Sequence, residues 1–245
     1  MVYGLRALVA GRCDVCRHIA FADDPSDETV PFLLYVWLLR GGERPMLVDT
    51  GPKDLETFNA ATSRYIPGGI VQRAGERTPE LLAAAGVDPA DVSHVFVTHL
   101  HPDHYEYFDL FPNAAMVVSD RGFREALPGI RPNVMRALAA RWPGALRLVG
   151  DEDVVPGVAT VQLGCHSRCS QAIVVHTAAG RAVLCGDVAY LYENIEGPRP
   201  IGGVDAGEWH AAMARARGAG DLLLPGHDPL LLQRHADGVI APAPG

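Results

Sequence analysis

The chain has 245 residues, of which 48% are hydrophobic and 20% are charged. This length fits one large domain or two small ones and buries a substantial core, and the composition excludes wholesale disorder. The 21 Lys and Arg residues against 29 Asp and Glu residues leave a net charge of −8. That balance disfavours nucleic acid or an anionic membrane surface as a partner. Ten histidines accompany a single lysine, Lys53, and these histidines require an explanation.

Apolar and β-branched runs predict strands through the first half of the chain, at residues 4–10, 31–40, 46–48, 92–98 and 115–119. The Gly-Gly-Glu segment at residues 41–43 is typical of a hairpin turn between the second and third of these strands. A helix is predicted at residues 78–85, with Thr78 as its N-cap and Gly86 as its terminator. A second helix is predicted at residues 133–141.

The second half repeats this pattern, with strands predicted at residues 158–163, 172–177, 182–185 and 221–224 and a helix at residues 208–217. Strands therefore cluster in each half, with helices between them. This distribution predicts two sheets packed together with helices outside, rather than a strictly alternating βαβ sheet. The Ala-, Pro- and Gly-rich tail after about residue 239 is expected to fray.

The five cysteines have an odd number and irregular spacing, which is not the pattern of a disulfide framework. Cys13 and Cys16 form a lone C-x-x-C without the second pair that a structural zinc site usually has, so we interpret them as surface or half-buried thiols. The first residues lack a basic start followed by an apolar run, and no stretch approaches 18 apolar residues. We therefore expect a cytoplasmic protein.

Four candidate metal ligands occupy six residues directly after the predicted strand that ends at Thr98: His99, His101, Asp103 and His104. In an extended stretch His99 and His101 share one face, because side chains alternate with a period of two. The chain must turn after the proline at position 102, which presents the other two side chains to a neighbouring point. Imidazoles and a carboxylate this close together are typical of a divalent cation site. Solvated loop histidines are the alternative interpretation.

This H-x-H-x-D-H segment resembles the signature of the metallo-β-lactamase superfamily, and further motifs follow in the family's order. Residues 47–51 (LVDTG) resemble the early D-T-G turn, whose Asp supports the metal site. His166 stands where a single-histidine ligand is expected after a strand. Residues 184–187 (LCGD) resemble the G-D element with its bridging carboxylate, and residues 224–227 (LPGH) the closing G-H element. The resemblance covers roughly residues 33–229.

The resemblance implies one α/β (α+β) domain over residues 1–245, folded as the four-layer αββα sandwich with its site at the sheet edges. It also implies two divalent metal ions, for which nitrogen and oxygen ligands suit zinc, although iron or manganese also fits. One ion would be held by His99, His101 and His166, and the other by Asp103, His104 and His227, with Asp187 between them.

By the same resemblance, a hydroxide between the two metals attacks a carbonyl, and Asp103 transfers a proton. The narrower similarity is to the N-acyl-homoserine-lactonase-like group. There a tyrosine three residues after the bridging Asp donates to the substrate carbonyl or the developing oxyanion. Tyr190 has that spacing from Asp187. A packed loop aromatic is the alternative interpretation of Tyr190, and Tyr192 is a weaker candidate for the same role.

Two departures from the lactonase pattern put the shape of the pocket in question. These lactonases usually have a glycine shortly after the D-H pair, whereas residues 105–108 here are YEYF. Around His166 the sequence GCHSRC replaces two expected glycines by Cys165 and Cys169, which predicts a different or stiffer backbone. We interpret both thiols as packing residues. Residues 53–75 and 191–204 are expected to form the pocket.

The sequence therefore predicts a dinuclear metal-dependent hydrolase of a small-molecule lactone or ester, as a monomer or homodimer. A thioester or other C–O or C–S hydrolase of specialised metabolism is an alternative, as is a mono-iron sulfur dioxygenase on the same fold. The complete ligand set, including His104 and His227, favours two metals. It also disfavours a non-catalytic binding module. The histidines at positions 94, 176, 210 and 235 lie outside the motifs and are interpreted as structural or surface residues.

Overall fold

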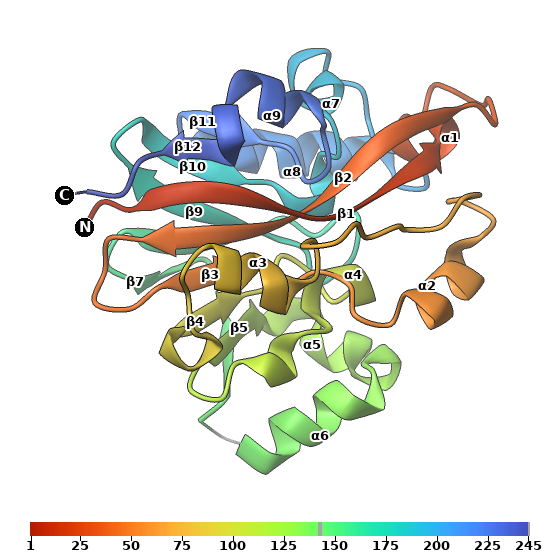
Figure 1. Ribbon diagram of the computed structural model, residues 1–245. Helices are drawn as coiled ribbons and strands as arrows, with labels where there is room; N and C mark the ends of the chain where they lie inside the picture. Colours follow the sequence, from red (N-terminus) through yellow and green to blue (C-terminus); the bar gives the residue numbers. More distant parts are fainter. Residues whose placement is uncertain (142–143, 245) are drawn as a thin grey trace.

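In the computed structural model, which describes residues 1–141 and 144–244, two β-sheets pack face to face and carry helices on their outer sides (Figure 1). The seven-stranded sheet has the order β12 (Val239–Ala241), β1 (Gly4–Cys16), β2 (Thr29–Arg40), β3 (Met46–Val48), β4 (His94–Phe96), β5 (Ala115–Ser119) and β6 (Leu146–Val149). The five-stranded sheet has the order β11 (Leu222–Leu224), β10 (Gly180–Leu184), β9 (Gln171–Thr177), β8 (Val158–Gln162) and β7 (Glu152–Val155).

The helices lie on two opposite sides of the sandwich (Figure 1). On the seven-stranded sheet lie α3 (Thr78–Ala84), α4 (Pro102–Tyr105), α5 (Asp120–Ala126) and α6 (Pro132–Arg141). With the five-stranded sheet lie α7 (Tyr192–Glu196), α8 (Ala206–Ala219) and α9 (Leu230–Arg234). The short α1 (Arg17–Ala20) and α2 (Leu55–Thr62) stand at one end. Short 3₁₀ turns lie at Pro89–Asp91, Phe108–Leu110, Leu127–Gly129, Gly186–Val188 and Ala236–Gly238.

Three large hydrophobic clusters fill the spaces between the four layers. They form on both faces of each sheet because neighbouring residues of a strand point to opposite faces. In β9, Ile173 and Val175 pack between the two sheets, whereas Val174 packs outward against α8. In β2, Trp37 packs between the sheets and Val36 packs toward the helices on the other side. Both sheets are thus apolar on both faces, which requires a helix layer on each outer side. The structure confirms the predicted αββα sandwich.

The predicted strands are largely confirmed, with shifted ends. The strand at residues 115–119 matches β5, while β1 continues six residues beyond its predicted end and therefore contains both Cys13 and Cys16. The strand predicted at residues 92–98 is only three residues long in β4, since the chain leaves the sheet before the histidine-rich segment. The helix at residues 133–141 is confirmed as α6, and that at residues 208–217 is extended at both ends in α8.

Two local predictions were wrong. Thr78 is not the N-cap of α3: Arg77 holds that position, and the Thr78 hydroxyl donates to the Thr50 carbonyl oxygen instead. Residues 239–241 are not frayed, because β12 pairs antiparallel with β1 and buries Ile240 and Ala241. Ile240 also packs in the hydrophobic cluster between the sheets, which holds this short edge strand in place.

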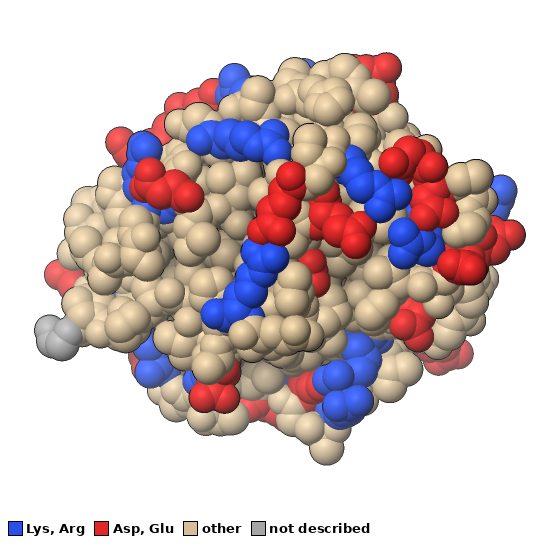
Figure 2. Space-filling view, turned by 90° about the horizontal axis from the view of Figure 1, so that it is seen from above, with Lys and Arg blue, Asp and Glu red and all other residues tan. Residues whose placement is uncertain are grey.

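Acidic and basic side chains stand side by side on the face shown in Figure 2. Many form ion pairs around α7 and α9, such as Arg199 with Asp23 and Arg234 with Glu196. Within the described residues, no helix has both the length and the apolar composition needed to cross a lipid bilayer.

Candidate metal centre

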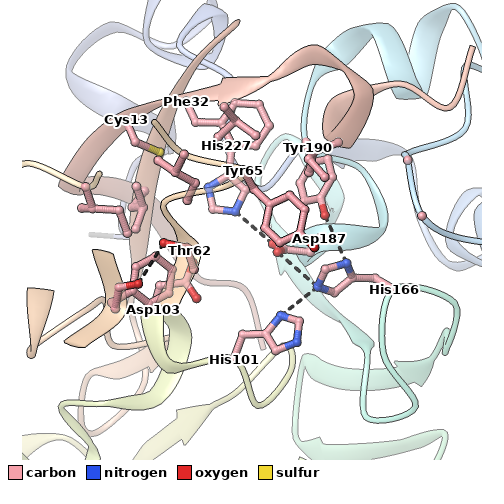
Figure 3. Close-up of a pocket in the computed structure, with 18 of the residues that line it drawn as sticks. Cys13, Phe32, Thr62, Tyr65, His101, Asp103, His166, Asp187, Tyr190 and His227 are labelled. Carbon is pink, nitrogen blue, oxygen red and sulfur yellow. Dashed lines mark hydrogen bonds and ion pairs between the residues drawn. The ribbon is translucent and has the colours of Figure 1, made fainter. Parts of the chain in front are cut away.

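The seven side chains predicted as metal ligands converge where four strands end. His99 and His101 lie in the short segment between β4 and α4, and α4 carries Asp103 and His104. The other three come from the second sheet, with His166 after β8, Asp187 after β10 and His227 after β11. Parallel pairing of β10 with β11, and of β4 with both β3 and β5, brings equivalent strand ends to the same edge. Figure 3 shows five of the seven side chains directed toward one cavity.

The first group contains His99, His101, His166 and Asp187, whose ligand atoms all lie within 4.8 Å of one another. His101 Nδ1 is 3.0 Å from His99 Nε2 and 2.9 Å from His166 Nε2. Asp187 Oδ2 lies 3.5 Å from His99 Nε2 and 3.4 Å from His166 Nε2. Three imidazole nitrogens and one carboxylate oxygen therefore face a common point.

The second group contains Asp103, His104 and His227 within the same 4.8 Å limit. His104 Nε2 is 3.4 Å from Asp103 Oδ2 and 3.3 Å from Asp187 Oδ1. Asp187 Oδ1 also lies 2.9 Å from His227 Nε2. One oxygen of Asp187 thus faces each group, which is the arrangement that the motif order predicts.

The outward nitrogens of three histidines are held by other parts of the protein. His104 Nδ1 donates to Asp49 Oδ2 at 2.8 Å, and His227 Nδ1 donates to the Leu33 carbonyl oxygen at 3.0 Å. His166 Nδ1 lies 3.1 Å from the Tyr190 hydroxyl. Such partners fix the ring orientation and direct the other nitrogen inward, as in protein metal sites.

Asp49 has the supporting position that the D-T-G motif predicts. Besides His104, it accepts hydrogen bonds from the Thr98 amide and the Thr98 hydroxyl, both at 2.8 Å. Its backbone is left-handed, with φ of 60°, a conformation that Asp tolerates better than most residues. The carboxylate thereby joins the end of β3 to Thr98, the residue that precedes the histidine-rich segment, and to His104 within it.

The donor set fits divalent metal ions. His104 Nε2 is buried and has no hydrogen-bond partner among the described residues, a costly state for a polar atom unless something binds it. Burial lowers the pKa of His166 to about 4 and that of His99 well below its ordinary value, so both rings are neutral. Neutral imidazole is the form that binds metals, and three imidazoles with a carboxylate suit zinc.

A cavity of about 420 Å³ opens above these side chains (Figure 3). Among the described residues that line it, none is Lys or Arg, and most of its wall is apolar. The predicted segments at residues 53–75 and 191–204 contribute to the wall, but the first contains a helix, α2, that was not predicted. The strand residues of the wall were not predicted; they are Cys13 and Val15 of β1 with Phe32 and Leu34 of β2. Their alternation along the two strands is the signal that could have found them.

Tyr190 and Tyr192 occupy different environments. The Tyr190 side chain is buried at the edge of the cavity, with its hydroxyl directed at His166 (Figure 3). Burial, reinforced by Asp187, raises the pKa of Tyr190 well above its ordinary value, so the hydroxyl keeps its proton. Tyr192 instead packs in the core between the sheets and does not line the cavity. The structure therefore favours Tyr190 over Tyr192 as the hydroxyl available to a substrate.

The cysteines beside His166 are accommodated without moving the histidine out of the site. Cys165 has φ of 71° and Gly164 has φ of 65°, so the loop has two consecutive left-handed residues. A side chain at Cys165 thus occupies a conformation usually left to glycine. Cys169 is buried in the core beneath the helices, and its Sγ accepts from the Leu100 amide at 3.2 Å. Both observations agree with packing roles for the two thiols.

Comparison with known proteins yields consistent similarities. The family profile described as Metallo-beta-lactamase superfamily matches residues 30–231. The N-acyl homoserine lactonase AiiA of Bacillus thuringiensis subsp. kurstaki is 27% identical over 201 residues, which cover 80% of each chain. The human Metallo-beta-lactamase domain-containing protein 1 is 33% identical over 150 residues, covering 60% of this chain and 52% of the human protein.

Solved structures of lactonases share the fold. A quorum-quenching N-acyl homoserine lactone lactonase has a TM-score of 0.80 at 24% identity, covering 98% of this chain and 99% of that one. An N-acyl homoserine lactone hydrolase, solved with N-hexanoyl-L-homoserine at its catalytic metal centre, has a TM-score of 0.79 at 24% identity, covering 96% and 97%. The dizinc quorum-quenching lactonase AidC has a TM-score of 0.66 at 18% identity, covering 97% and 89%.

Proposed function

The chain belongs to the metallo-beta-lactamase superfamily, and we propose that it is a dinuclear, zinc-dependent hydrolase of a neutral small-molecule lactone or ester. The observation that carries this proposal is the pair of adjoining ligand groups at the floor of an apolar cavity. Metal ions bound there would stand at one end of a cavity whose apolar lining favours uncharged organic molecules.

We assign His99, His101 and His166 to one ion and Asp103, His104 and His227 to the other, with Asp187 between them. When bound, two divalent ions supply a hydroxide nucleophile near neutral pH and polarise the carbonyl of the substrate. The protein supplies the ligand geometry, which the hydrogen bonds of Asp49 and the Leu33 carbonyl hold in place.

Two side chains of the cavity are suited to proton placement. The Tyr190 hydroxyl stays protonated at neutral pH and stands beside His166, where it can donate a hydrogen bond to the carbonyl oxygen as negative charge develops there. Asp103 lines the cavity floor and can pass a proton to the leaving oxygen. Both roles require contact with the reacting atoms, and both residues reach the cavity.

The lining of the cavity indicates the substrate class. Apolar side chains of β1, β2 and α2 surround it, and no cationic side chain among the described lining residues is available to bind a substrate carboxylate. A neutral lactone with an apolar substituent fits this lining. Because several similar proteins are named N-acyl homoserine lactonases, N-acyl homoserine lactones are the first substrates to test, with thioesters and simple esters beside them.

The decisive experiment combines metal analysis with a substrate panel at fixed pH. We expect about two equivalents of zinc per chain and turnover of neutral lactones. The variant His99→Ala lacks one proposed ligand and should lose both metal and activity. The control His210→Ala removes an exposed imidazole outside both ligand groups and should change neither. One equivalent of iron with sulfur oxidation and no ester hydrolysis would instead identify a mono-iron dioxygenase.

A further inference from the structure

One segment singled out in the sequence has no part in the metal site. Tyr105, Glu106 and Tyr107 directly follow the histidine-rich motif, where the resemblance predicts a glycine. All three side chains are buried, yet none of them lines the cavity. A buried acid such as Glu106, which is only 1% exposed, needs full compensation by hydrogen bonds or ion pairs.

Glu106 obtains this compensation from the turn that precedes α2. Its Oε2 accepts from the backbone amides of Lys53 and Asp54, at 2.8 and 2.9 Å. Its Oε1 forms an ion pair with Arg131 Nε at 2.5 Å. Arg131 in turn binds Asp54 Oδ2 through its guanidinium at 2.9 Å, and its amide donates to the Tyr105 hydroxyl at 3.0 Å. These contacts form one network across three segments of the chain.

The network joins a wall of the cavity to the metal-binding helix. Asp54 caps α2 by accepting from the Thr57 amide at 3.1 Å, and α2 presents Phe58 and Thr62 to the cavity. Glu106 immediately follows α4, which carries Asp103 and His104. The Glu106 carboxylate therefore fixes the start of α2, which forms part of the cavity wall, relative to α4, which carries two of the candidate metal ligands.

The apolar packing of α2 is small, and the Asn59 side chain adds two hydrogen bonds to the backbone of Ile70, at 3.0 and 2.7 Å, which tie α2 to the cavity wall and not to the metal-binding helix. Phe58 is the one buried side chain of α2, and it packs in a small cluster with Leu34 and Ile70. These three residues also line the cavity, so this cluster loses part of its apolar contact whenever the cavity is solvated. In Figure 1, α2 stands apart from the body of the sandwich.

We propose that Glu106 is a positioning residue for substrate recognition: through the Lys53–Asp54 turn and Arg131, it fixes α2 relative to the metal centre. The inference rests on the proposed function for its substrate and on the contacts above for its geometry. Glu106→Gln keeps the size of the side chain but loses the charge, so the turn and Arg131 are bound more weakly.

The first test does not depend on activity. Hydrogen exchange of the zinc-loaded protein should show faster exchange of α2 amides in Glu106→Gln, by about tenfold or more. Asp54→Asn should give the same effect at smaller size, because it retains the cap while weakening the bond to Arg131. Asp109→Asn, which removes only the partner of the Lys53 side chain, is the matched control and should leave α2 unchanged.

The second test compares two lactones, one unsubstituted and one with a long apolar substituent. Glu106→Gln should raise KM for the substituted lactone by about tenfold, with kcat and zinc content close to those of the wild type. Unchanged exchange of α2, or equal losses of kcat for both lactones together with loss of zinc, would overturn the proposal. If Glu106→Gln does not fold, Asp54→Asn decides. If the wild type hydrolyses no lactone or ester, the proposed function fails while the exchange measurement still decides the role of Glu106.

Discussion

Two regions of the cavity are supported in different ways: the floor, formed by the candidate metal ligands, and the part of the wall that α2 forms. The floor comes from four strand ends, and the outward ring nitrogens of three of its histidines are held by Asp49, Tyr190 and the Leu33 carbonyl. The wall formed by α2 rests on one small apolar cluster, on two hydrogen bonds between Asn59 and the backbone of Ile70, and on the contacts of Glu106. A floor held by the sandwich keeps a constant geometry for chemistry. A wall held by few contacts can change its fit to substrates without disturbing that geometry, so changes in the two regions should affect different kinetic parameters.

The largest effect is expected from the floor. Asp187→Ala removes the carboxylate that faces both ligand groups, so metal content and kcat should fall together. The metals contribute several kcal/mol to the transition state, which corresponds to about 10³-fold or more in rate. Metal analysis and steady-state kinetics measure this, with the exposed Asp221→Ala as control. Full activity in Asp187→Ala would contradict a dinuclear mechanism.

Tyr190→Phe tests a residue that borders both regions. Removal of the hydroxyl should lower kcat by about 100-fold while zinc content stays unchanged, because the hydroxyl contacts His166 without belonging to either ligand group. Tyr192→Phe is the matched control, since its buried hydroxyl has no hydrogen-bond partner among the described residues. Equal rates for the two variants would return Tyr190 to a packing role.

The smallest effect is expected from the wall. Phe58→Ala removes one large apolar side chain from the cavity, so KM for a lactone with an apolar substituent should rise by about tenfold. Phe58→Leu, which keeps an apolar side chain, should show a smaller rise. Both should retain their zinc and nearly all of kcat. Loss of metal from Phe58→Ala would show that floor and wall are not independent.

The contrast between the two regions also explains what the sequence could predict of the site. His99, His101, Asp103 and His104 lie within six residues, so local spacing alone indicates a metal site. The distant candidates His166, Asp187 and His227 are recognisable only from the order of family motifs, because a lone histidine or aspartate carries no local signal. Glu106 could not be predicted, since its partners lie about 50 and 25 positions away along the chain.

The fold was predictable where burial imposes a regular pattern. β5 and β9 are continuous apolar runs because both of their faces are covered, and their predicted positions agree with the structure. The helix α2 escaped prediction because it buries a single side chain and so lacks an apolar stripe. β12 was mistaken for a frayed tail because it is stabilised by pairing with β1, which lies at the other end of the chain and leaves no local signal in the sequence.

The lining of the cavity also affects how the product leaves after bond cleavage. In the proposed reaction, hydrolysis opens an uncharged lactone to a hydroxy acid, which is ionised at neutral pH. Asp103 and Asp187 already place negative charge at the floor, and the described lining offers no lysine or arginine as a counter-charge. Apart from the bound ions, the compartment that retains the reactant therefore has nothing to retain the product. Ring opening therefore creates a negative charge for which, among the described lining residues, only the metal end of the cavity would offer a partner, so release of the product should depend on how tightly the ions hold its carboxylate.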